Sequence, residues 1–339
     1  MRVAIYGAGA MGTILGAYIA SCGKQVDLIT RNKEHVEAMK EHGAHILGCV
    51  DFTVRVNALT PDEMTGVYDI IFLMTKQREN AKVLTSIKDF LAKDGVICTM
   101  QNGLPEPSVI EAVGAKRCLG CAVAWGATAA GYGEVELTSK KNKMNFVLGS
   151  TTGYDKWIAP VKEYLECAGK VTVEENFFSA RWAKLVINSA FSPLSAVTGM
   201  KFGQVAREKY SRRLVIALMN EAFAVAEQCG VEIAPIQGHN LVDIFKCKGG
   251  AKAWFARLIL PIAMRNHRNI ISGMHADLAA GRRCDVEFIN GIIQKLGNKF
   301  DVDTPVTDAV MKFIRNIERG EEKISRENTK IIYEKVYKS

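Results

Sequence analysis

The sequence predicts an α/β fold in its first half, built on a doubly wound parallel sheet, and an all-helical domain in its second half. Apolar runs of strand length alternate with amphipathic helical patterns up to about residue 173, and long amphipathic helices follow. A chain of 339 residues is long enough for two domains. We therefore expect a doubly wound domain over residues 1–173 and a helical domain over residues 174–339.

The expected strands are near-continuous apolar runs, the pattern of strands covered on both faces in a parallel sheet. They lie at residues 2–6, 25–30, 69–75 and 95–100, with further strands between residues 119 and 148. Helical periodicity separates them at residues 11–21, 34–42 and 80–91. Because strand and helix alternate in this way, right-handed crossovers are expected between parallel neighbours.

The second half shows helical spacing of its apolar residues, most clearly at residues 214–228 and 285–300. An apolar run at Trp254-Phe255 and at residues 258–260 is expected to pack inside the helical domain or to form a homodimer contact. The highly charged end, residues 320–339, is expected to be a solvated helix or a frayed tail.

The composition is that of a globular protein with a substantial core. Hydrophobic residues make up 48% of the chain and charged residues 24%, which excludes the disordered, collagen-like and coiled-coil classes. The longest apolar runs have strand length and no signal-peptide pattern opens the sequence, so no membrane partner is expected. Nine cysteines without the spacing of a disulfide framework indicate reduced thiols. We therefore expect a cytoplasmic protein.

The charge pattern narrows the expected ligands to small molecules. The formal net charge is +8, which attracts small anions, but the basic residues are dispersed and not interleaved with aromatic residues, so no nucleic-acid partner is expected. Metal binding is not expected either, because Cys118 and Cys121 form a lone CxxC pair and the histidines lack a ligand spacing. The basic segment at residues 140–143 is expected to be a solvated hairpin loop.

A glycine-rich loop joins the first strand to the first helix. Its G-x-G-x-x-G spacing lies inside a unit of about 30 residues that runs strand, helix, strand. In such a loop the first glycine permits a tight turn, the second admits a pyrophosphate, and the third lets helix and strand pack closely, while the helix N-terminus attracts phosphate. This dinucleotide-binding pattern of Rossmann domains predicts cofactor contacts from Gly7, Ala8, Gly9, Ala10, Met11 and Gly12.

The end of the second strand distinguishes between nicotinamide cofactors. A site that prefers NAD carries a carboxylate there, about 20 residues past the loop, that accepts a hydrogen bond from the ribose. This sequence has Arg31 instead, and Asp27 lies too early, within the strand. A guanidinium suits the 2′-phosphate of NADP through charge-assisted hydrogen bonds. We therefore predict NADP(H) as the cofactor and Arg31 as its 2′-phosphate contact; the alternative is a surface arginine without this role.

The first helix of the second half carries a polar stripe. Lys184, Asn188 and Ser192 are four residues apart, so they share one face of a helix that is otherwise rich in large apolar residues. A lysine among buried neighbours is costly unless it meets an anion or a reacting oxygen. Lys184 is therefore a candidate general acid for a carbonyl that receives hydride, and the alternative is a lysine whose ammonium reaches the surface.

Three more residues are candidates for the same site. Lys76 ends one parallel strand and Asn102 follows the next, so both lie at the carboxyl edge, where such sheets bind ligands. The alternatives are a solvated lysine and a simple Asn-Gly turn. Asp285 begins a helix, where it either helps close the site over the cofactor or only complements the helix dipole.

Together these motifs resemble the ketopantoate reductase (2-dehydropantoate 2-reductase) family. The resemblance covers nearly the whole chain in the same order, and the lysine-to-asparagine helix motif is its most specific part. It rests on the glycine loop, Lys76, Gln101-Asn102-Gly103, Trp182-x-Lys184-Leu185-x-x-Asn188, and the segment from Ser272 that ends in Asn290-Gly291.

The resemblance implies an NADP-dependent oxidoreductase that reduces a 2-oxo acid to a 2-hydroxy acid, in this family ketopantoate to pantoate in pantothenate and coenzyme A biosynthesis. It implies that Lys184 is the proton donor. The further cofactor contacts it implies are Lys76, Asn102, Gly126 and Asp285. The substrate contacts it implies are Asn102, Lys184, Asn188, Ser192 and Ser272.

The sequence departs from the family pattern on the substrate side. Ser192 stands where the family commonly has a second substrate-binding asparagine, and Gly273, preceded by Ser272, stands where it has a serine. The acidic pair is inverted, with Asp285 before Glu287. Two alternatives therefore stay open: a related 2-hydroxy-acid dehydrogenase for a branched or aromatic 2-oxo acid, and an NADPH-binding sensor without catalytic activity.

Overall fold

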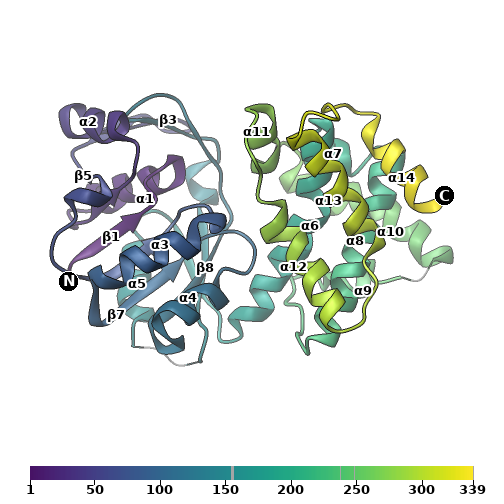
Figure 1. Cartoon of the computed structure of the whole chain (residues 1–339), viewed down its shortest axis with the longest axis horizontal. Coiled ribbons are helices and arrows are strands. Elements are labelled where there is room, and N and C mark those ends of the chain that lie inside the picture. The colour runs from purple at the N-terminus through teal and green to yellow at the C-terminus, as the bar shows by residue number, and fades with distance from the viewer. Residues whose placement is uncertain (154–155, 237, 248, 339) are drawn as a thin grey trace. The chain divides into compact units, whose positions relative to one another are not determined.

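The computed structural model describes residues 1–153, 156–236, 238–247 and 249–338. The chain forms two compact units, Met1–Phe177 and Phe178–Ser339, drawn from purple to teal and from teal to yellow in Figure 1. Within the described residues, every named strand belongs to the first unit, and the second is built from helices. This confirms the predicted fold class.

The main sheet of the first unit has eight strands. They are β1 (Val3–Tyr6), β2 (Asp27–Ile29), β5 (Asn57–Leu59), β6 (Tyr68–Leu73), β7 (Leu91–Thr99), β8 (Cys118–Val123), β11 (Asn145–Ser150) and β12 (Lys170–Val173). Their order is β12-β11-β8-β7-β6-β1-β2-β5, parallel throughout except where β11 meets β8. The chain therefore starts at the centre of the sheet, proceeds to one edge and returns to the other side of β1 with β6. In sheets of this topology, ligands bind at the carboxyl ends of the strands where the order reverses, which here are β1 and β6.

Helices cover both faces of this sheet, which is why its strands are apolar without alternation. On one face lie α1 (Ala10–Ser21) and α5 (Ile158–Leu165), and on the other α3 (Asn80–Ile87) and α4 (Glu106–Val113). Successive residues of β1 enter different cores: Ile5 packs with α1, while Ala4 and Tyr6 pack with α3. The helix expected at residues 80–91 is shorter, because residues 88–90 form a 3₁₀ turn and β7 begins at Leu91.

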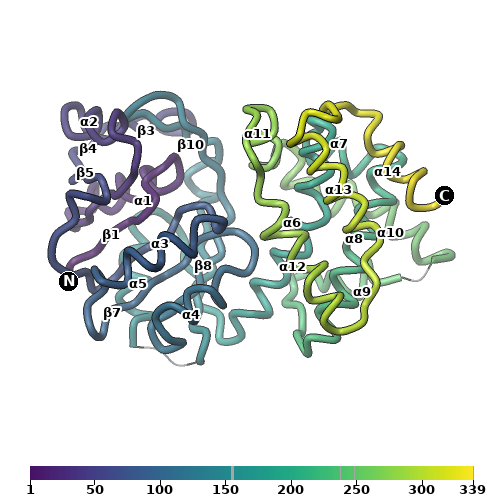
Figure 2. Tube along the Cα trace, viewed as in Figure 1, coloured from purple at the N-terminus to yellow at the C-terminus, as the bar shows by residue number. Residues whose placement is uncertain are grey.

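A second sheet, which the sequence did not predict as a separate layer, covers the outer side of α1. Its strands are β3 (Ala44–Gly48), β4 (Phe52–Val54), β9 (Ala127–Ala129) and β10 (Glu134–Leu137), in the order β4-β3-β10-β9. Its strands contact α1, and Figure 2 shows β3, β4 and β10 beside α1 and α2 (Lys33–His42). Residues 140–143 therefore do not form the expected hairpin loop, because β10 and β11 belong to different sheets.

The second unit is organised around one long helix. Its helices are α6 (Phe177–Thr198), α7 (Phe202–Val205), α8 (Lys209–Gln228), α9 (Leu241–Phe245), α10 (Gly250–Ala263), α11 (Gly273–Ala279), α12 (Val286–Lys299), α13 (Pro305–Glu318) and α14 (Asn328–Tyr337). Helix α8 packs against α10, α12, α13 and α14. Within the described residues, none of the helices is long and apolar enough to cross a membrane.

For two segments of this unit the structure excludes one of the two expected alternatives. Residues 328–337 form a helix, one of the two alternatives, and are not a frayed tail: α14 packs on α8 and α13, Ile332 is buried, and the Nδ2 atom of Asn328 donates to the carbonyl of Val197 at 2.8 Å. On α10, Trp254 and Phe255 do not pack inside the unit, because more than half of each residue is exposed. Apolar periodicity marks such residues as helical without showing what covers them.

Candidate active site

The glycine loop lies between β1 and α1, and backbone atoms crowd its first and last glycines. Gly7 has a φ of +111°, and a Cβ added to it would lie 2.5 Å from the backbone nitrogen of Thr75. A Cβ on Gly12 would lie 2.5 Å from the carbonyl oxygen of Gly7. Only glycine fits either position, because the neighbouring atoms are backbone and cannot move away cheaply.

The middle of the loop is open. A Cβ on Gly9 would meet no atom of the described chain within 4 Å. Gly9 is also the N-cap of α1, its cap has no side-chain hydrogen bond, and the first turn holds no acidic residue. The first N–H groups of a helix have no acceptor inside it and attract anions. The loop therefore fits a pyrophosphate at Gly9, with the N–H groups that follow as donors.

A buried histidine, His35, is linked to this loop through hydrogen bonds, and sequence analysis did not single it out. The Nδ1 atom of His35 accepts from the N–H of Gly133 at 2.9 Å, and its Nε2 atom lies 3.0 Å from Oγ1 of Thr13. Thr13 Oγ1 in turn donates to the carbonyl of Ala8 at 3.3 Å. Burial lowers the pKa of His35, so the neutral ring, protonated at Nε2, links the loop to α2 and the second sheet.

Arg31 follows β2 directly, as the sequence predicts. Its side chain is 66% exposed, and its guanidinium lies 3.4 Å from the carboxylate of Glu79. Asn32 then caps α2, accepting from the N–H of His35 at 3.0 Å. Asp27 is engaged in the sheet, because its carboxylate accepts from the hydroxyl of Tyr68 at 2.8 Å. The arginine is therefore the strand-end group that is accessible to a ligand.

The loops that carry Lys76 and Asn102 follow the adjacent strands β6 and β7 and are tied together. The Nε2 atom of Gln101 donates to the carbonyl of Thr75 at 2.8 Å. The side-chain amides of Gln101 and Asn80 bond to each other in both directions, at 2.7 and 3.1 Å. Both amides are buried, so this pair holds Lys76 and Asn102 at one edge of the sheet.

Gly126, three residues past β8, lies at the same edge by topology. Its N–H donates to Oγ of Ser139 at 3.0 Å, and a Cβ there would lie 2.7 Å from Oγ1 of Thr138. The carboxyl edge of the main sheet thus carries all the predicted cofactor residues of the first unit. They are the glycine loop, Arg31, Lys76, Asn102 and Gly126.

In the second unit, α6 carries the polar stripe. Lys184 and Asn188 are half-buried, whereas Leu185 and Val186 beside them are buried. Ser192, one turn further on, is 8% exposed. Lys184 and Asn188 thus lie four residues apart on α6 and are both partly exposed; their role in a substrate site stays a prediction.

The two remaining predicted residues occupy helix starts. Ser272 caps α11: its Oγ accepts from the N–H of His275 at 3.1 Å, so its hydroxyl has a structural partner. Asp285 is the N-cap of α12. Glu287, the other member of the inverted acidic pair, forms two hydrogen bonds with Arg315, at 2.6 and 2.9 Å.

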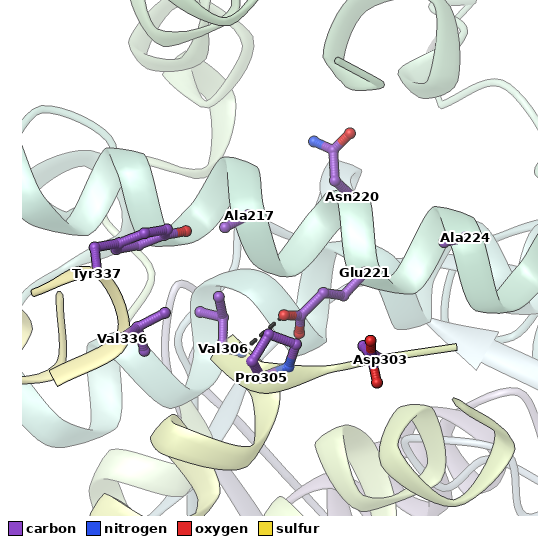
Figure 3. A pocket seen from close by; sticks show the side chains of 9 residues that line it. All are labelled: Ala217, Asn220, Glu221, Ala224, Asp303, Pro305, Val306, Val336 and Tyr337. Atoms are coloured by element: carbon purple, nitrogen blue, oxygen red, sulfur yellow. Dashed lines mark hydrogen bonds between the residues drawn. The ribbon is translucent and has the colours of Figure 1, made fainter. Parts of the chain in front are cut away.

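A surface pocket elsewhere in the second unit contains none of the predicted site residues. Figure 3 shows Glu221 pointing at the start of α13, where its carboxylate accepts from the N–H groups of Val306 and Thr307 at 2.7 and 2.9 Å. Burial raises the pKa of Glu221. This carboxylate caps a helix and has no need of a ligand. The pocket is lined by Ala217, Asn220, Glu221, Ala224, Asp303, Pro305, Val306, Val336 and Tyr337.

Two family models match the chain in sequence order. Residues 3–150 match the model described as "Ketopantoate reductase PanE/ApbA", and residues 176–318 match "Ketopantoate reductase PanE/ApbA C terminal". A 2-dehydropantoate 2-reductase of Archaeoglobus fulgidus is 29% identical, over 94% of this chain and 98% of the relative. A 2-dehydropantoate 2-reductase of Pyrococcus horikoshii is 27% identical, over 90% and 94%.

Solved structures of the same fold cover nearly the whole chain. A PanE/ApbA family ketopantoate reductase from Ralstonia eutropha superposes with a TM-score of 0.78 and 25% identity, over 95% of this chain and 99% of that one. A D-mandelate dehydrogenase, solved with NADH and anilino(oxo)acetate, superposes with a TM-score of 0.80 and 22% identity, over 94% and 99%. At that identity the second likeness concerns the fold alone.

Proposed function

The chain belongs to the ketopantoate reductase family of oxidoreductases, and on this basis we propose that it reduces 2-dehydropantoate (ketopantoate) to pantoate with NADPH. The observation that carries the proposal is the pair Lys184 and Asn188, half-buried on one face of a helix whose other residues are largely buried. Such a pair provides a proton and a hydrogen bond to a small polar substrate.

NADPH is the preferred cofactor because of the groups at the carboxyl edge of the sheet. The open position at Gly9 and the N-terminus of α1 fit the pyrophosphate. The exposed guanidinium of Arg31 suits a 2′-phosphate, for which a carboxylate at the strand end would be repulsive. If the phosphate replaces Glu79 as the partner of Arg31, the guanidinium still has an anionic partner.

The chain's own part in the reaction is to bind, orient and protonate the keto acid. The bound cofactor supplies hydride from its nicotinamide ring. Negative charge then grows on the carbonyl oxygen, and the Lys184 ammonium stabilises it and delivers the proton from Nζ. Asn188, Ser192 and Asn102 provide hydrogen bonds that orient the substrate. Lys76 adds positive charge that favours binding of the substrate carboxylate. Asp285 is assigned to the cofactor.

The test of this proposal is NADPH oxidation, followed at 340 nm across a panel of 2-oxo acids with ketopantoate first. We expect the highest kcat/KM with ketopantoate. Lys184→Ala should lower kcat by a factor of about 10² to 10⁴, the usual contribution of a general acid, while the Kd for NADPH stays within about twofold. Lys201→Ala, which removes an exposed lysine of the same unit, is the matched control and should remain active. A fully active Lys184→Ala variant contradicts the assignment.

A second candidate substrate class is favoured by Ser192, which replaces the second asparagine expected from the family resemblance. A shorter side chain leaves more room beside the substrate, which suits a larger branched or aromatic 2-oxo acid. The panel decides between the two classes, and no NADPH oxidation with any 2-oxo acid would instead favour a non-catalytic NADPH-binding protein.

A further inference from the structure

Helix α6 contains a proline in its interior, Pro193. Proline has no N–H group, and its ring crowds the carbonyl four residues earlier, so one helical hydrogen bond is lost. In α6 that carbonyl belongs to Ser189, which is buried. The Ser189 hydroxyl does not supply the missing donor, because it donates to the carbonyl of Val186 at 3.1 Å. A buried carbonyl left without a donor would destabilise the helix at this point.

The missing donor comes from another helix. Asn290, in α12, donates from Nδ2 to the carbonyl oxygen of Ser189 at 2.8 Å. The side chain of Asn290 is fully buried, so water does not compete for this bond. The distance and the burial together identify Asn290 as the residue that replaces the N–H that Pro193 lacks.

This bond joins α6, which carries three predicted substrate contacts, to α12, which begins at the predicted cofactor contact Asp285. Lys184 and Asn188 precede Ser189 on α6, and Ser192 precedes Pro193 directly. Asp285 caps the start of α12, about one and a half turns before Asn290. The hydrogen bond therefore fixes the position of the polar stripe relative to Asp285, at the point where a proline would otherwise let α6 bend freely.

We propose that Asn290 is a positioning residue for the reduction: by replacing the hydrogen bond lost at Pro193, it holds α6 at the angle that the Lys184 stripe requires. The role of the polar stripe in catalysis rests on the proposed function. The hydrogen bond between Asn290 and Ser189 is independent of that function. Asn290 is not a catalytic residue in this account, because it acts through the backbone of α6.

The test starts with Asn290→Leu, which keeps the volume of the side chain and removes the donor. We expect kcat/KM for the preferred 2-oxo acid to fall by a factor of about 10 to 10², as for a displacement of about 1 Å at a reacting group. The Kd for NADPH should change by no more than about threefold, because the glycine loop and Arg31 belong to the other unit and Asp285 is the one predicted cofactor contact on α12. Asn328→Leu is the matched control: it removes a buried amide that donates to the carbonyl of Val197, near the end of α6, and it should lose stability with little change in kcat/KM.

A Pro193→Ala background separates positioning from a general loss of structure. Alanine restores the N–H, so Asn290→Leu should lower kcat/KM by less than about threefold in this background, against tenfold or more with the proline present. The same contrast is expected in the free energy of unfolding. An equal loss in both backgrounds would overturn the proposal, as would wild-type kcat/KM in the Asn290→Leu single variant.

Two other outcomes also decide the question. If Asn290→Leu does not fold, the double variant with Pro193→Ala should fold, and its failure to do so would overturn the proposal. If the wild-type chain oxidises NADPH with no 2-oxo acid, the proposed function fails. The coupling between Asn290 and Pro193 in unfolding free energy then still decides whether the two residues act together.

Discussion

His35 is a buried histidine with both ring nitrogens engaged, and its neutral form is built into the fold. Gly133 donates to Nδ1, so a proton added there would face a donor instead of an acceptor. The pKa of His35 is lowered by burial. The folded protein therefore resists protonation of this ring more strongly than the unfolded chain does.

This difference predicts a loss of stability in mild acid. Above the unfolded pKa of about 6.5 both states are neutral at this residue. As the pH falls below that value, only the unfolded chain takes up the proton, so the free energy of unfolding falls, by at most about 1.4 kcal/mol per pH unit. Denaturant unfolding of the wild type and of His35→Gln between pH 7.5 and 5 should show a steeper decline for the wild type.

His45 provides a control of opposite sign. Hydrogen bonds with Asp51 and Glu134 raise its pKa, so its contribution to stability is present at low pH and is lost as the pH rises through that raised value. His45→Gln should therefore remove a stabilisation on the acid side. If His35→Gln declines with pH as steeply as the wild type, the neutral role of His35 is wrong.

Arg31 allows a prediction on cofactor choice. Arg31→Ala should weaken NADPH binding by a factor of about 10 to 10², the value of a charge-assisted hydrogen bond pair to phosphate, and change NADH binding little. Glu79→Gln releases the guanidinium from its 3.4 Å ion pair and should leave NADPH binding equal or tighter, because an exposed pair contributes little. Fluorescence titration of both cofactors measures these constants. Equal losses for NADPH and NADH in Arg31→Ala would contradict the 2′-phosphate contact.

At the scale of single residues, the sequence allowed the position of a residue in the fold to be predicted where that position depends on neighbours along the chain. The glycine loop and the strand-end position of Arg31 follow from local order alone. The roles of His35 and Asn290 could not be predicted, because their partners, Gly133 and Ser189, are far away in sequence. For Asn290, the local sequence offers Pro193 alone. A proline inside a helix implies that the carbonyl four residues earlier lacks its usual donor, but it does not show which residue replaces that donor.

At the scale of elements, the first turn of α1 shows how two glycines of one motif differ. Gly9 faces open space, whereas Gly12 faces the backbone of Gly7. Neither glycine has a positive φ, so an alanine is compatible with the backbone conformation at both positions. Only the surrounding atoms distinguish the two positions.

The two substitutions should therefore fail in different ways. Gly9→Ala should fold with nearly wild-type stability and bind NADPH at least about tenfold more weakly, because its methyl group occupies the place of the pyrophosphate. Gly12→Ala should lose about 1 to 3 kcal/mol of stability through overpacking against backbone. Thermal unfolding and NADPH titration of both variants provide the measurements. A stable Gly9→Ala variant with unchanged NADPH affinity would show that the phosphate does not approach there.

Most elements could be predicted from periodicity, and the exceptions share one cause. The main-sheet strands and the long helices carry strong local patterns. The second sheet consists of short strands, and β3 pairs with β10, so that His45 lies opposite Glu134. A pairing between strands so far apart in the sequence cannot be detected from the pattern of ten neighbouring residues. The burial of α14 and the exposure of α10 likewise depend on distant elements.

At the scale of the whole molecule, α10 leads us to expect a homodimer. Trp254, Leu258 and Ile262 are four residues apart and 59%, 46% and 71% exposed, so they form one apolar stripe on the helix surface. A stripe of this kind is typical of a surface that a partner covers. A second copy is the simplest partner, because it presents the same stripe.

Light scattering during size-exclusion chromatography tests this expectation. The wild type should have twice the mass of the 37.3 kDa chain, and Leu258→Glu should shift it to one chain mass, because a buried, unpaired carboxylate is costly at an interface. Lys252→Glu changes an exposed residue of the same helix and should leave the dimer intact. A wild type with the mass of one chain would refute the dimer.

The second sheet also has a consequence for biosynthesis. Because β10 lies beside β3, the layer over α1 is completed only after residue 137 has left the ribosome. Until then a nascent chain that already contains the glycine loop has the outer side of its first helix uncovered, and His35 lacks Gly133. We therefore expect cofactor capture at the glycine loop during translation to wait for the 85 residues between Gly48 and Glu134, although the loop itself lies within the first dozen residues.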